Sequence, residues 1–210
     1  MDKKELFNEW SSTYNDSVKK SDKENTYPFA GYSLIKAKIF AMVMNKDKPK
    51  ILEMGIGTGE ITRKLYDEGL NITGVDLSEK MIAESRISMP NVRYINKDFT
   101  KSLKVLKDTK FDVIIFSYSI HHVTIKNQLS LLNSLMININ IGGIIIISDV
   151  MTNTIKELDN ISLKYHKIWD DDEYYPTLER YEESLLKTNY NITFEQVSFC
   201  SGILTLTKKF

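Results

Sequence analysis

The stretch that decides the fold is ILEMGIGTGEIT, residues 51–62, in which a short apolar run leads into three glycines spaced two residues apart. Gly55, Gly57 and Gly59 let the backbone bend sharply and approach a ligand closely, and we expect a helix to begin behind them near Glu60. This pattern predicts a buried strand, a ligand-binding turn and a helix. A glycine turn also occurs where α/β proteins bind nothing, so its neighbours must identify the ligand.

From residue 50 onward, short apolar runs alternate with amphipathic segments. We expect strands at 51–54, 72–76, 92–95, 111–117, 144–148, 192–199 and 203–207, and helices at 60–68, 79–88, 126–139, 155–168 and 178–188. This alternation predicts a parallel sheet with crossover helices. Residues 200–202 are too few for a crossover, so the last two strands should form an antiparallel hairpin. The predicted fold class is α/β: a Rossmann-like, seven-stranded, mostly parallel sheet with a C-terminal antiparallel hairpin.

Residues 1–45 have a different pattern and predict an N-terminal helical cap or lid, whereas residues 46–210 form the predicted Rossmann-like domain. Large side chains at spacings of three and four predict one face of a helix, with Trp10 as a core residue: Phe7, Trp10, Tyr14 and Val18. Residues 21–28 are polar and turn-like. A second helical pattern runs through Ile35, Ile39 and Met42.

The composition is that of an ordinary globular protein, with 42% hydrophobic residues and 28 basic residues balanced by 28 acidic ones. This neutrality argues against nucleic acid as the main partner, because phosphate neutralisation supplies most of the affinity of duplex-binding proteins. The N-terminal residues do not predict a signal peptide. The apolar run 141–147 is too short for a membrane-spanning helix, which needs about 20 residues. Cys200 is the only cysteine, which excludes an internal disulfide and a cysteine zinc cluster. We expect a cytoplasmic protein with no membrane partner, as a monomer or homodimer.

Acidic residues around the glycine turn indicate the ligand. A dinucleotide fingerprint would place glycine at position 60, where the chain has Glu60, which would repel a pyrophosphate. Glu53 precedes the first glycine and suits a ligand with positive charge. Asp76 ends the second strand, where a carboxylate can hold a ribose diol, although it could be a simple turn residue. Asp98 follows the third strand and could accept from an adenine amino group, while Phe99 lies against the ring.

The motifs that carry a family resemblance are ILEMGIGTGEIT (51–62), GVDLS (74–78), NKDF (96–99) and FDVIIFSYSIHHV (111–123). They resemble the class I S-adenosylmethionine (SAM) dependent methyltransferases over residues 50–150. SAM carries an ammonium and a sulfonium but no phosphate, which fits the acidic pattern. Four further motifs resemble the bacterial YrrT-like methyltransferases: FNEWSSTYNDSV (7–18), FAGYSLIK (29–36), SYSIHHVT (117–124) and YYPTLERYEESL (174–185).

The resemblance implies a site for SAM, and for its product S-adenosylhomocysteine (SAH), that requires no metal. The glycines would wrap the methionine part, with Glu53 on its ammonium side and Asp76 on the ribose. Ser117 and Tyr118 would line the methionine side. The residues predicted to bind the cofactor are Tyr14, Glu53, Gly55, Gly57, Gly59, Asp76, Leu77, Met81, Asp98, Phe99, Ser117 and Tyr118.

His121 and His122 follow the fourth strand, at the edge where ligands gather in such sheets, and are the candidate catalytic residues. Either histidine could instead cap the next helix. A metal pair is not expected, because the chain has only one further histidine, His166, and no carboxylate stands beside the pair at ligand spacing. Residues 170–173 read as a solvated acidic turn. The candidate substrate residues are Tyr27, Tyr32, Asp149 and Tyr175.

The predicted function is transfer of the SAM methyl group to a small-molecule acceptor by in-line displacement. The cofactor already activates the methyl group, so the protein mainly aligns the reactants and excludes water. A base is needed only if the acceptor must lose a proton. Two alternatives remain: a non-catalytic SAM- or SAH-binding regulator has the same motifs, and a nucleotide-dependent oxidoreductase is disfavoured by Glu60.

Overall fold

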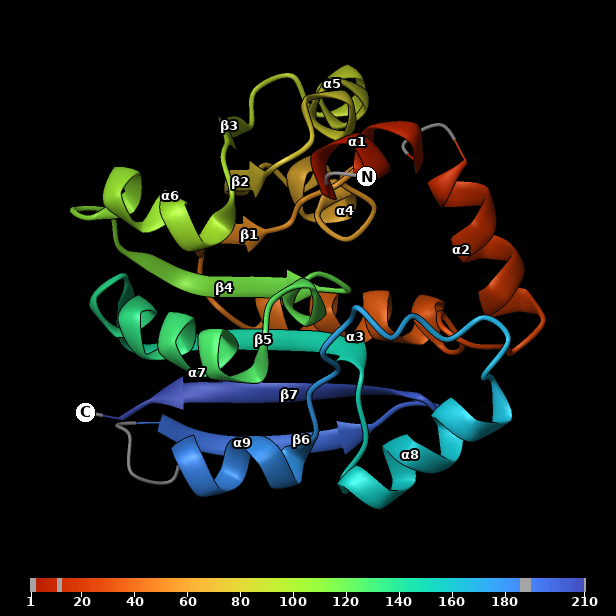
Figure 1. Cartoon of the computed structure of the whole chain (residues 1–210). Coiled ribbons are helices and arrows are strands. Elements are labelled where there is room, and N and C mark those ends of the chain that lie inside the picture. Colours follow the sequence, from red (N-terminus) through yellow and green to blue (C-terminus); the bar gives the residue numbers. More distant parts are fainter. Residues whose placement is uncertain (1–2, 11–12, 186–189, 210) are drawn as a thin grey trace.

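The computed structural model describes residues 3–10, 13–185 and 190–209, and within them seven strands form one sheet in the order β3-β2-β1-β4-β5-β7-β6 (Figure 1). The strands are β1 (Lys50–Met54), β2 (Asn71–Asp76), β3 (Arg93–Asn96), β4 (Phe111–Ser117), β5 (Ile139–Val150), β6 (Tyr190–Gln196) and β7 (Ser201–Lys208). Pairing is parallel from β3 to β5, and β7 runs antiparallel to both β5 and β6. The predicted fold class and the C-terminal hairpin are confirmed.

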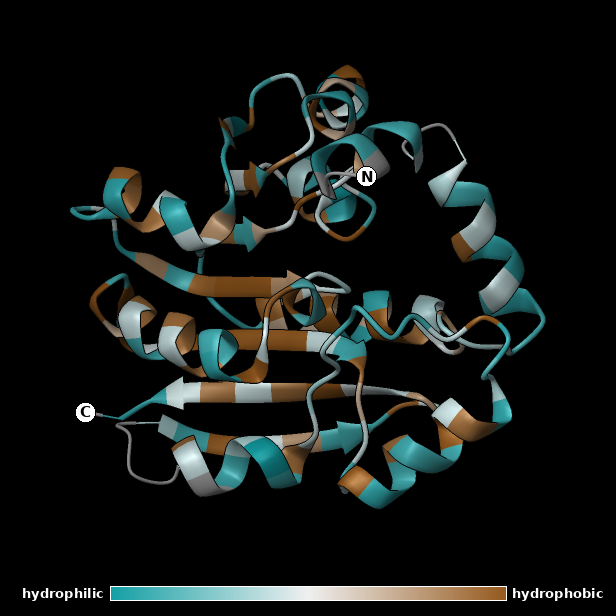
Figure 2. Cartoon of the chain, in the orientation of Figure 1, coloured by the Kyte–Doolittle hydropathy of each residue, from teal (hydrophilic) through white to brown (hydrophobic). Residues whose placement is uncertain are grey.

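Helices cover both faces of the sheet. One face carries α3 (Tyr32–Met44), α4 (Arg63–Asp67) and α5 (Glu79–Ser88), and the other carries α6 (Phe99–Leu106), α7 (Ile125–Ser134) and α9 (Leu178–Leu185). Figure 1 shows α6, α7 and α9 in front of the sheet and α3 behind it. The central strands β4 and β5 are almost wholly hydrophobic in Figure 2, as expected for parallel strands buried on both faces.

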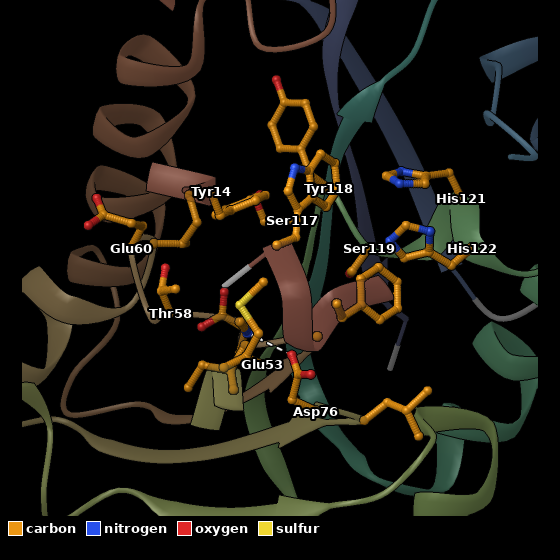
Figure 3. Close-up of a pocket in the computed structure, with 18 of the residues that line it drawn as sticks. Tyr14, Glu53, Thr58, Glu60, Asp76, Ser117, Tyr118, Ser119, His121 and His122 are labelled. Carbon is orange, nitrogen blue, oxygen red and sulfur yellow. Dashed lines mark hydrogen bonds between the residues drawn. The ribbon is translucent and has the colours of Figure 1, made fainter. Parts of the chain in front are cut away.

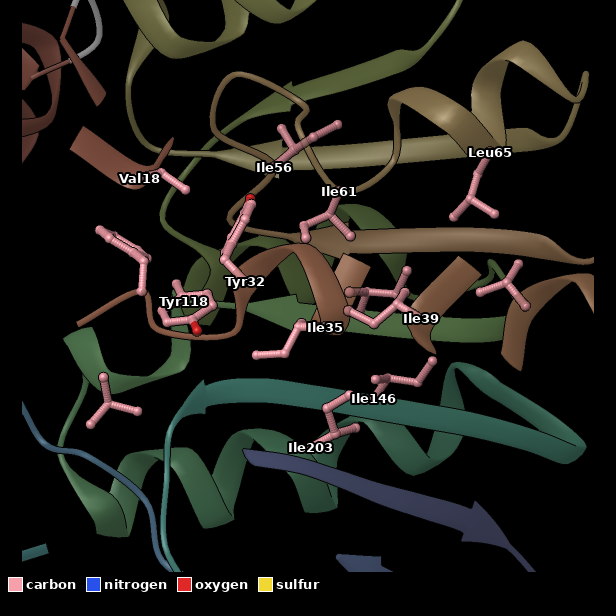
Figure 4. Packing of buried hydrophobic residues seen from close by; sticks show 14 of the residues in the cluster. Val18, Tyr32, Ile35, Ile39, Ile56, Ile61, Leu65, Tyr118, Ile146 and Ile203 are labelled. Carbon is pink, nitrogen blue, oxygen red and sulfur yellow. The ribbon is translucent and has the colours of Figure 1, made fainter. Parts of the chain in front are cut away.

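Alternate residues of the central strands pack into two separate cores. On β4, Val113 joins the core under α3, whereas the next residue, Ile114, joins the core under α7. In Figure 4 the α3 side chains Ile35 and Ile39 lie against Ile146 of β5, and all three are fully buried. Burying an isoleucine side chain contributes about 1.5–3 kcal/mol. These layers hold the carboxyl ends of β1, β2 and β4 in a fixed arrangement.

Two separate helices, α1 (Lys3–Trp10) and α2 (Tyr14–Lys23), begin the described chain. The predicted single helical face from Phe7 to Val18 is therefore wrong. Residues 11–12, between the two helices, lie outside the described residues. Figure 1 shows α1 beside α5, while α2 runs from there toward α3.

Helices α4, α6 and α7 differ most from the prediction, and α8 ends at Lys164 rather than at residue 168. Gly55, Gly57 and Gly59 all have positive φ, so the turn continues past Glu60 and α4 begins only at Arg63. Helix α6 was not predicted, although Asp98 caps it by accepting a hydrogen bond from the Thr100 amide. Helix α7 ends early because η2 (Leu135–Ile137) and then the long strand β5 follow it.

The carboxyl ends of β1, β2, β4 and β5 point to the same side of the molecule in Figure 1. Helices α1 and α2 and the segment 165–177, which follows α8 (Ile155–Lys164), lie at this side and form its cover. No helix in the described ranges has both the length and the apolar character needed to cross a membrane.

Candidate functional site

A pocket lies at the carboxyl ends of β1, β2 and β4, beneath α1 and α2 (Figure 3). Eleven of the predicted cofactor residues line it: Tyr14, Glu53, Gly55, Gly57, Asp76, Leu77, Met81, Asp98, Phe99, Ser117 and Tyr118. Tyr32, Tyr175, His121 and His122 also line it. The sequence therefore predicted the floor of this pocket well, although these contacts leave the role of each residue a prediction.

Gly59 is the cofactor residue that does not line the pocket. A Cβ atom at Gly59 would collide with the Met89 and Ser85 side chains, and the residue has a φ of +84°. Glycine is thus required there because the turn packs against α5 and its following loop. Gly59 therefore has a packing role in the turn, and its contact with a ligand stays a prediction.

Glu53 is the buried carboxyl group at the centre of the pocket. Its side chain comes from β1, is 1% exposed, and its Oε2 atom has no hydrogen-bond partner among the described residues. Burial, with the nearby charge of Asp76, raises the pKa of Glu53 from 4.5 to about 8. An unpaired buried carboxylate is costly unless a cation or a donor reaches it. This arrangement prepares the pocket for a ligand that brings positive charge.

Asp76 organises the glycine turn. Its Oδ2 accepts a hydrogen bond from the Gly57 amide at 2.7 Å, and its Oδ1 accepts one from the Ser78 amide at 2.8 Å. Burial raises the pKa of Asp76, and these backbone donors oppose that shift. Ser78 also caps α5, since its hydroxyl accepts from the Met81 amide. Asp76 thus holds the turn in shape and faces the pocket at once.

Asp98 and Phe99 stand at the end of β3, where the adenine was predicted. Asp98 lines the pocket, but its Oδ1 already accepts from the amide and the hydroxyl of Thr100, at 2.8 Å and 2.6 Å. Its capping role was missed because α6 was not predicted. Phe99 lines the pocket beside it and packs edge-on against Phe116, with ring centroids 6.0 Å apart.

Tyr118 turns the end of β4 into the pocket. Its backbone has a φ of +47°, a conformation that a non-glycine residue adopts at a cost of about 1–3 kcal/mol and mostly at functional sites. The ring packs against Phe29 and Tyr32, with centroids 4.9 Å and 5.5 Å away. Its hydroxyl donates to Ser201 Oγ at 3.0 Å. Phe29 was not predicted as a site residue, although it stands in the motif FAGYSLIK.

His121 lies between two carboxylates that are far from it in sequence. Its Nδ1–H donates to Asp149 Oδ1 at 2.7 Å, and its Nε2 is 3.3 Å from Glu173 Oε1. Burial alone would lower the pKa of His121, but the charges of Asp149 and Glu173 outweigh burial and raise it to about 10. In this form His121 is an imidazolium at neutral pH, which does not accept a proton.

The Glu173 carboxylate lies beside both histidines. Its Oε1 is 3.6 Å from His122 Nδ1, and its other oxygen accepts from the Tyr175 hydroxyl. Although burial opposes this, the bond to His121 lowers the pKa of Glu173 to about 2. Two predictions are therefore wrong: Glu173 is not part of a solvated turn, and the pair does have carboxylates near it. Sequence spacing could not show this, because tertiary packing brings residue 173 to residue 121.

Two of the predicted substrate residues do not line the pocket. Tyr27 lies behind Tyr175, with the two hydroxyls 2.6 Å apart, and its ring stacks on Tyr165 and Trp169. Asp149 is fully buried behind His121. Tyr27 contacts Tyr175 and Asp149 contacts His121, two residues of the pocket wall, and a direct contact of either with a substrate stays a prediction.

The cap helices close the pocket and are tied to its floor. Asn8 of α1 accepts a hydrogen bond from the Ser78 hydroxyl at 2.6 Å, and Asn15 of α2 accepts one from the Thr58 hydroxyl at 2.8 Å. Trp10 lines the pocket and is 39% exposed, which corrects its prediction as a core residue. Phe7, which was placed only on a helix face, also lines the pocket and packs on His122, with ring centroids 4.8 Å apart.

The pocket wall is acidic as well as aromatic. Five carboxylate residues line it, and among the described lining residues there is no lysine or arginine: Glu53, Glu60, Asp76, Asp98 and Glu173. Figure 3 shows His121 and His122 together on one side of the pocket, with Glu53 and Asp76 on another. The acidic lining favours a cationic ligand. The lining residues also give the pocket two chemically different ends.

Known proteins share this fold and part of this sequence. Residues 51–143 match the family model described as a methyltransferase domain. An uncharacterised methyltransferase from Alkaliphilus oremlandii is 27% identical over 211 residues, covering 97% of this chain and 96% of the relative. Magnesium protoporphyrin IX methyltransferase from Synechocystis PCC 6803 with bound SAH has a TM-score of 0.70 at 17% identity, covering 99% of this chain and 100% of that chain. Its complex with SAM gives 0.65 at 16% identity, covering 100% and 98%.

These matches support the resemblance to methyltransferases, and the likeness to the solved structures confirms the predicted Rossmann-like fold. The narrower resemblance to the YrrT-like group and the role of each site residue stay predictions.

Proposed function

We propose that this protein, which carries a methyltransferase domain over residues 51–143, binds SAM in the described pocket and transfers its methyl group to a small-molecule acceptor by in-line displacement. The observation that carries the proposal is Glu53, a buried carboxylate with an unpartnered oxygen, set under the glycine turn of an acidic pocket. SAM offers an ammonium and a sulfonium, which a dinucleotide does not.

The two ends of the pocket suit the two reactants. Glu53, Asp76 and Asp98 surround the end predicted for the cofactor. His121 and His122 form the opposite end (Figure 3), the Tyr175 ring lies 5.2 Å from that of His121, and the acceptor would lie there. Methyl transfer from a sulfonium needs alignment of the nucleophile, the carbon and the sulfur, together with exclusion of water. The cap and the packed rings of Phe29 and Tyr118 are suited to both tasks.

A small acceptor is favoured by how the pocket is enclosed. Phe7 and Trp10 of α1 and Tyr14 of α2 line it from above, and hydrogen bonds that Asn8 and Asn15 accept from Ser78 and Thr58 tie these helices to the floor. A polymer or a folded protein would have to displace the cap. The formal net charge of zero gives no general attraction to nucleic acid.

Whether a base acts on the acceptor depends on the protonation of the two histidines. Because the pKa of His121 is raised to about 10 by the two carboxylates, the imidazolium suits holding an acceptor rather than taking its proton. We expect His121→Asn and His122→Asn each to lower turnover while SAM affinity changes little. Normal turnover in both variants would show that the histidines have a structural role.

Calorimetric titration of the pure protein with SAM, SAH and NADH tests the cofactor assignment. SAM and SAH should bind with one site per chain, and NADH should not. Incubation with SAM and a small-molecule extract then separates an enzyme from a regulator. An enzyme releases SAH and yields a product heavier by one methylene group, whereas a regulator binds SAM without turnover.

A further inference from the structure

The strongest feature that methyl transfer does not explain is the cluster His121, His122 and Glu173. The histidines belong to the short helix η1 (Ile120–His122), and Glu173 belongs to the segment that follows α8. Each offers one ligand atom, and the three atoms lie within 4.8 Å of one another. We propose that these three side chains form a binding site for a divalent transition metal, Zn²⁺ by preference, at the acceptor end of the pocket.

Two distances within the cluster are close to the separation between ligands of one zinc ion. Glu173 Oε1 is 3.3 Å from His121 Nε2 and 3.6 Å from His122 Nδ1. Ligands about 2.0–2.1 Å from a tetrahedral zinc lie about 3.4 Å from one another. The longer separation exceeds the range of a normal hydrogen bond. Two imidazole nitrogens thus converge on one carboxylate oxygen at the edge length of a zinc tetrahedron.

Asp149 provides the outer support that such a site needs. Its Oδ1 accepts from His121 Nδ1–H at 2.7 Å and from the Val150 amide at 2.8 Å, so the ring is fixed with Nε2 toward Glu173. Metal-bound histidines usually donate their other N–H to a carboxylate or carbonyl in this way. Asp149 is fully buried, and its Oδ2 has no hydrogen-bond partner in the described parts of the chain. A dication would take the place of the proton on His121 Nε2 and would balance part of this negative charge.

The proposed site keeps an open side. All three ligand residues line the pocket, so an ion there would have three protein ligands and a free position facing the acceptor end. Two histidines and one glutamate with a free position form the ligand set of catalytic rather than structural zinc. The role of the ion, unlike its binding, rests on the proposed methyl transfer. The ion would bind a sulfur or oxygen atom of the acceptor, and the proton of that atom would go to solvent. The same atom would then take the methyl group from SAM, and SAH would leave.

Metal binding is tested without any acceptor. Protein without an affinity tag is treated with a chelator and titrated with Zn²⁺ by calorimetry, and with Co²⁺ by visible absorption. We expect one Zn²⁺ per chain, with affinity lowered at least tenfold by His122→Asn and by Glu173→Gln. Asp149→Asn should weaken binding about 10–100-fold. The matched control is His166→Asn, because His166 is the remaining histidine and is exposed.

Two further readouts guard against variants that fail to fold. His122→Cys replaces one ligand by another and should keep the metal, and X-ray absorption of the zinc-loaded wild type should show two imidazole ligands. Absence of stoichiometric Zn²⁺ binding by the wild type overturns the proposal. So does a spectrum without imidazole, or equal affinity in His122→Asn and His166→Asn. SAM affinity is measured in parallel, so loss of SAM binding with retained metal binding counts against the proposed function alone.

Discussion

Replacing Glu53 by glutamine should weaken SAM binding and at the same time stabilise the free protein. A charge-assisted hydrogen bond to the ligand ammonium contributes roughly 1.5–3 kcal/mol, so Glu53→Gln should raise the Kd for SAM about 10- to 150-fold. Glutamine has nearly the same shape, so the pocket itself should be preserved. NADH, which is expected not to bind, serves as the negative control.

The pKa of Glu53 gives this prediction a pH signature. With a pKa of about 8 in the free protein, about nine-tenths of the molecules hold a proton on Glu53 at pH 7. SAM would displace that proton, so the affinity for SAM should rise about 30-fold between pH 5.5 and 7.0. The α-amino group of SAM stays charged over this range, because such groups lose their proton only near pH 7.7–8.0. Calorimetry in two buffers of different ionisation enthalpy measures the release directly. In Glu53→Gln the release and most of the slope should disappear.

The stability of the free protein should change in the opposite direction. The folded pKa of Glu53 is raised above its value of 4.5, so the folded state holds the extra proton and loses stability as pH rises from about 4.5 to 8. The shift corresponds to at most about 5 kcal/mol, because each pKa unit is worth about 1.4 kcal/mol. Glu53→Gln should therefore unfold at a higher temperature than the wild type at pH 8. Equal SAM affinity and equal proton release in both proteins would refute this assignment of Glu53.

Three further predictions concern the turn and the cap. Asp76→Ala should weaken SAM and SAH by about 1.5–3 kcal/mol each in a calorimetric titration, because it removes a carboxylate placed for the ribose; unchanged affinity would contradict that placement. Hydrogen exchange over residues 6–32 should slow when SAH binds, since α1 and α2 cover the pocket, and equal protection with and without SAH would argue against a lid. Gly59→Ala should lower the Tm more than Gly69→Ala does. The Gly69→Ala substitution should itself lower the free energy of unfolding by about 1–2 kcal/mol. Both glycines have positive φ, but only at Gly59 would a Cβ collide; an equal loss would contradict the packing role.

The sequence predicted the sheet and the residues that line the pocket under the glycine turn, because both depend on local signals. An apolar run followed by Gly55 and Gly57 predicts a strand and a turn, and the carboxyl ends of parallel strands must meet at one edge. Glu53, Asp76 and Asp98 each stand at such an end, so their meeting in one pocket follows from strand order alone.

The end of the pocket at His121 and His122 could not be predicted, because it depends on contacts between distant segments. Glu173 reaches His121 only through the fold of the segment after α8, and nothing in the run Asp170 to Glu173 marks one acid as buried. Asp149 was predicted as a substrate residue because it ends a strand, yet its side chain turns to His121 instead. Gly59 was assigned to the ligand by its spacing, whereas the packing of the turn on α5 explains it.

The measurement that tests the central claim most directly is the release of SAH from SAM by the purified protein in the presence of a small-molecule extract. The extract is first passed through a filter that removes proteins and nucleic acids. We predict SAH formation that needs both the protein and the extract, with a methylated product, and that falls in Glu53→Gln. SAM that binds but yields no SAH with any extract fraction would contradict methyl transfer and leave a regulator. Failure to bind SAM at all would contradict the account of the pocket itself.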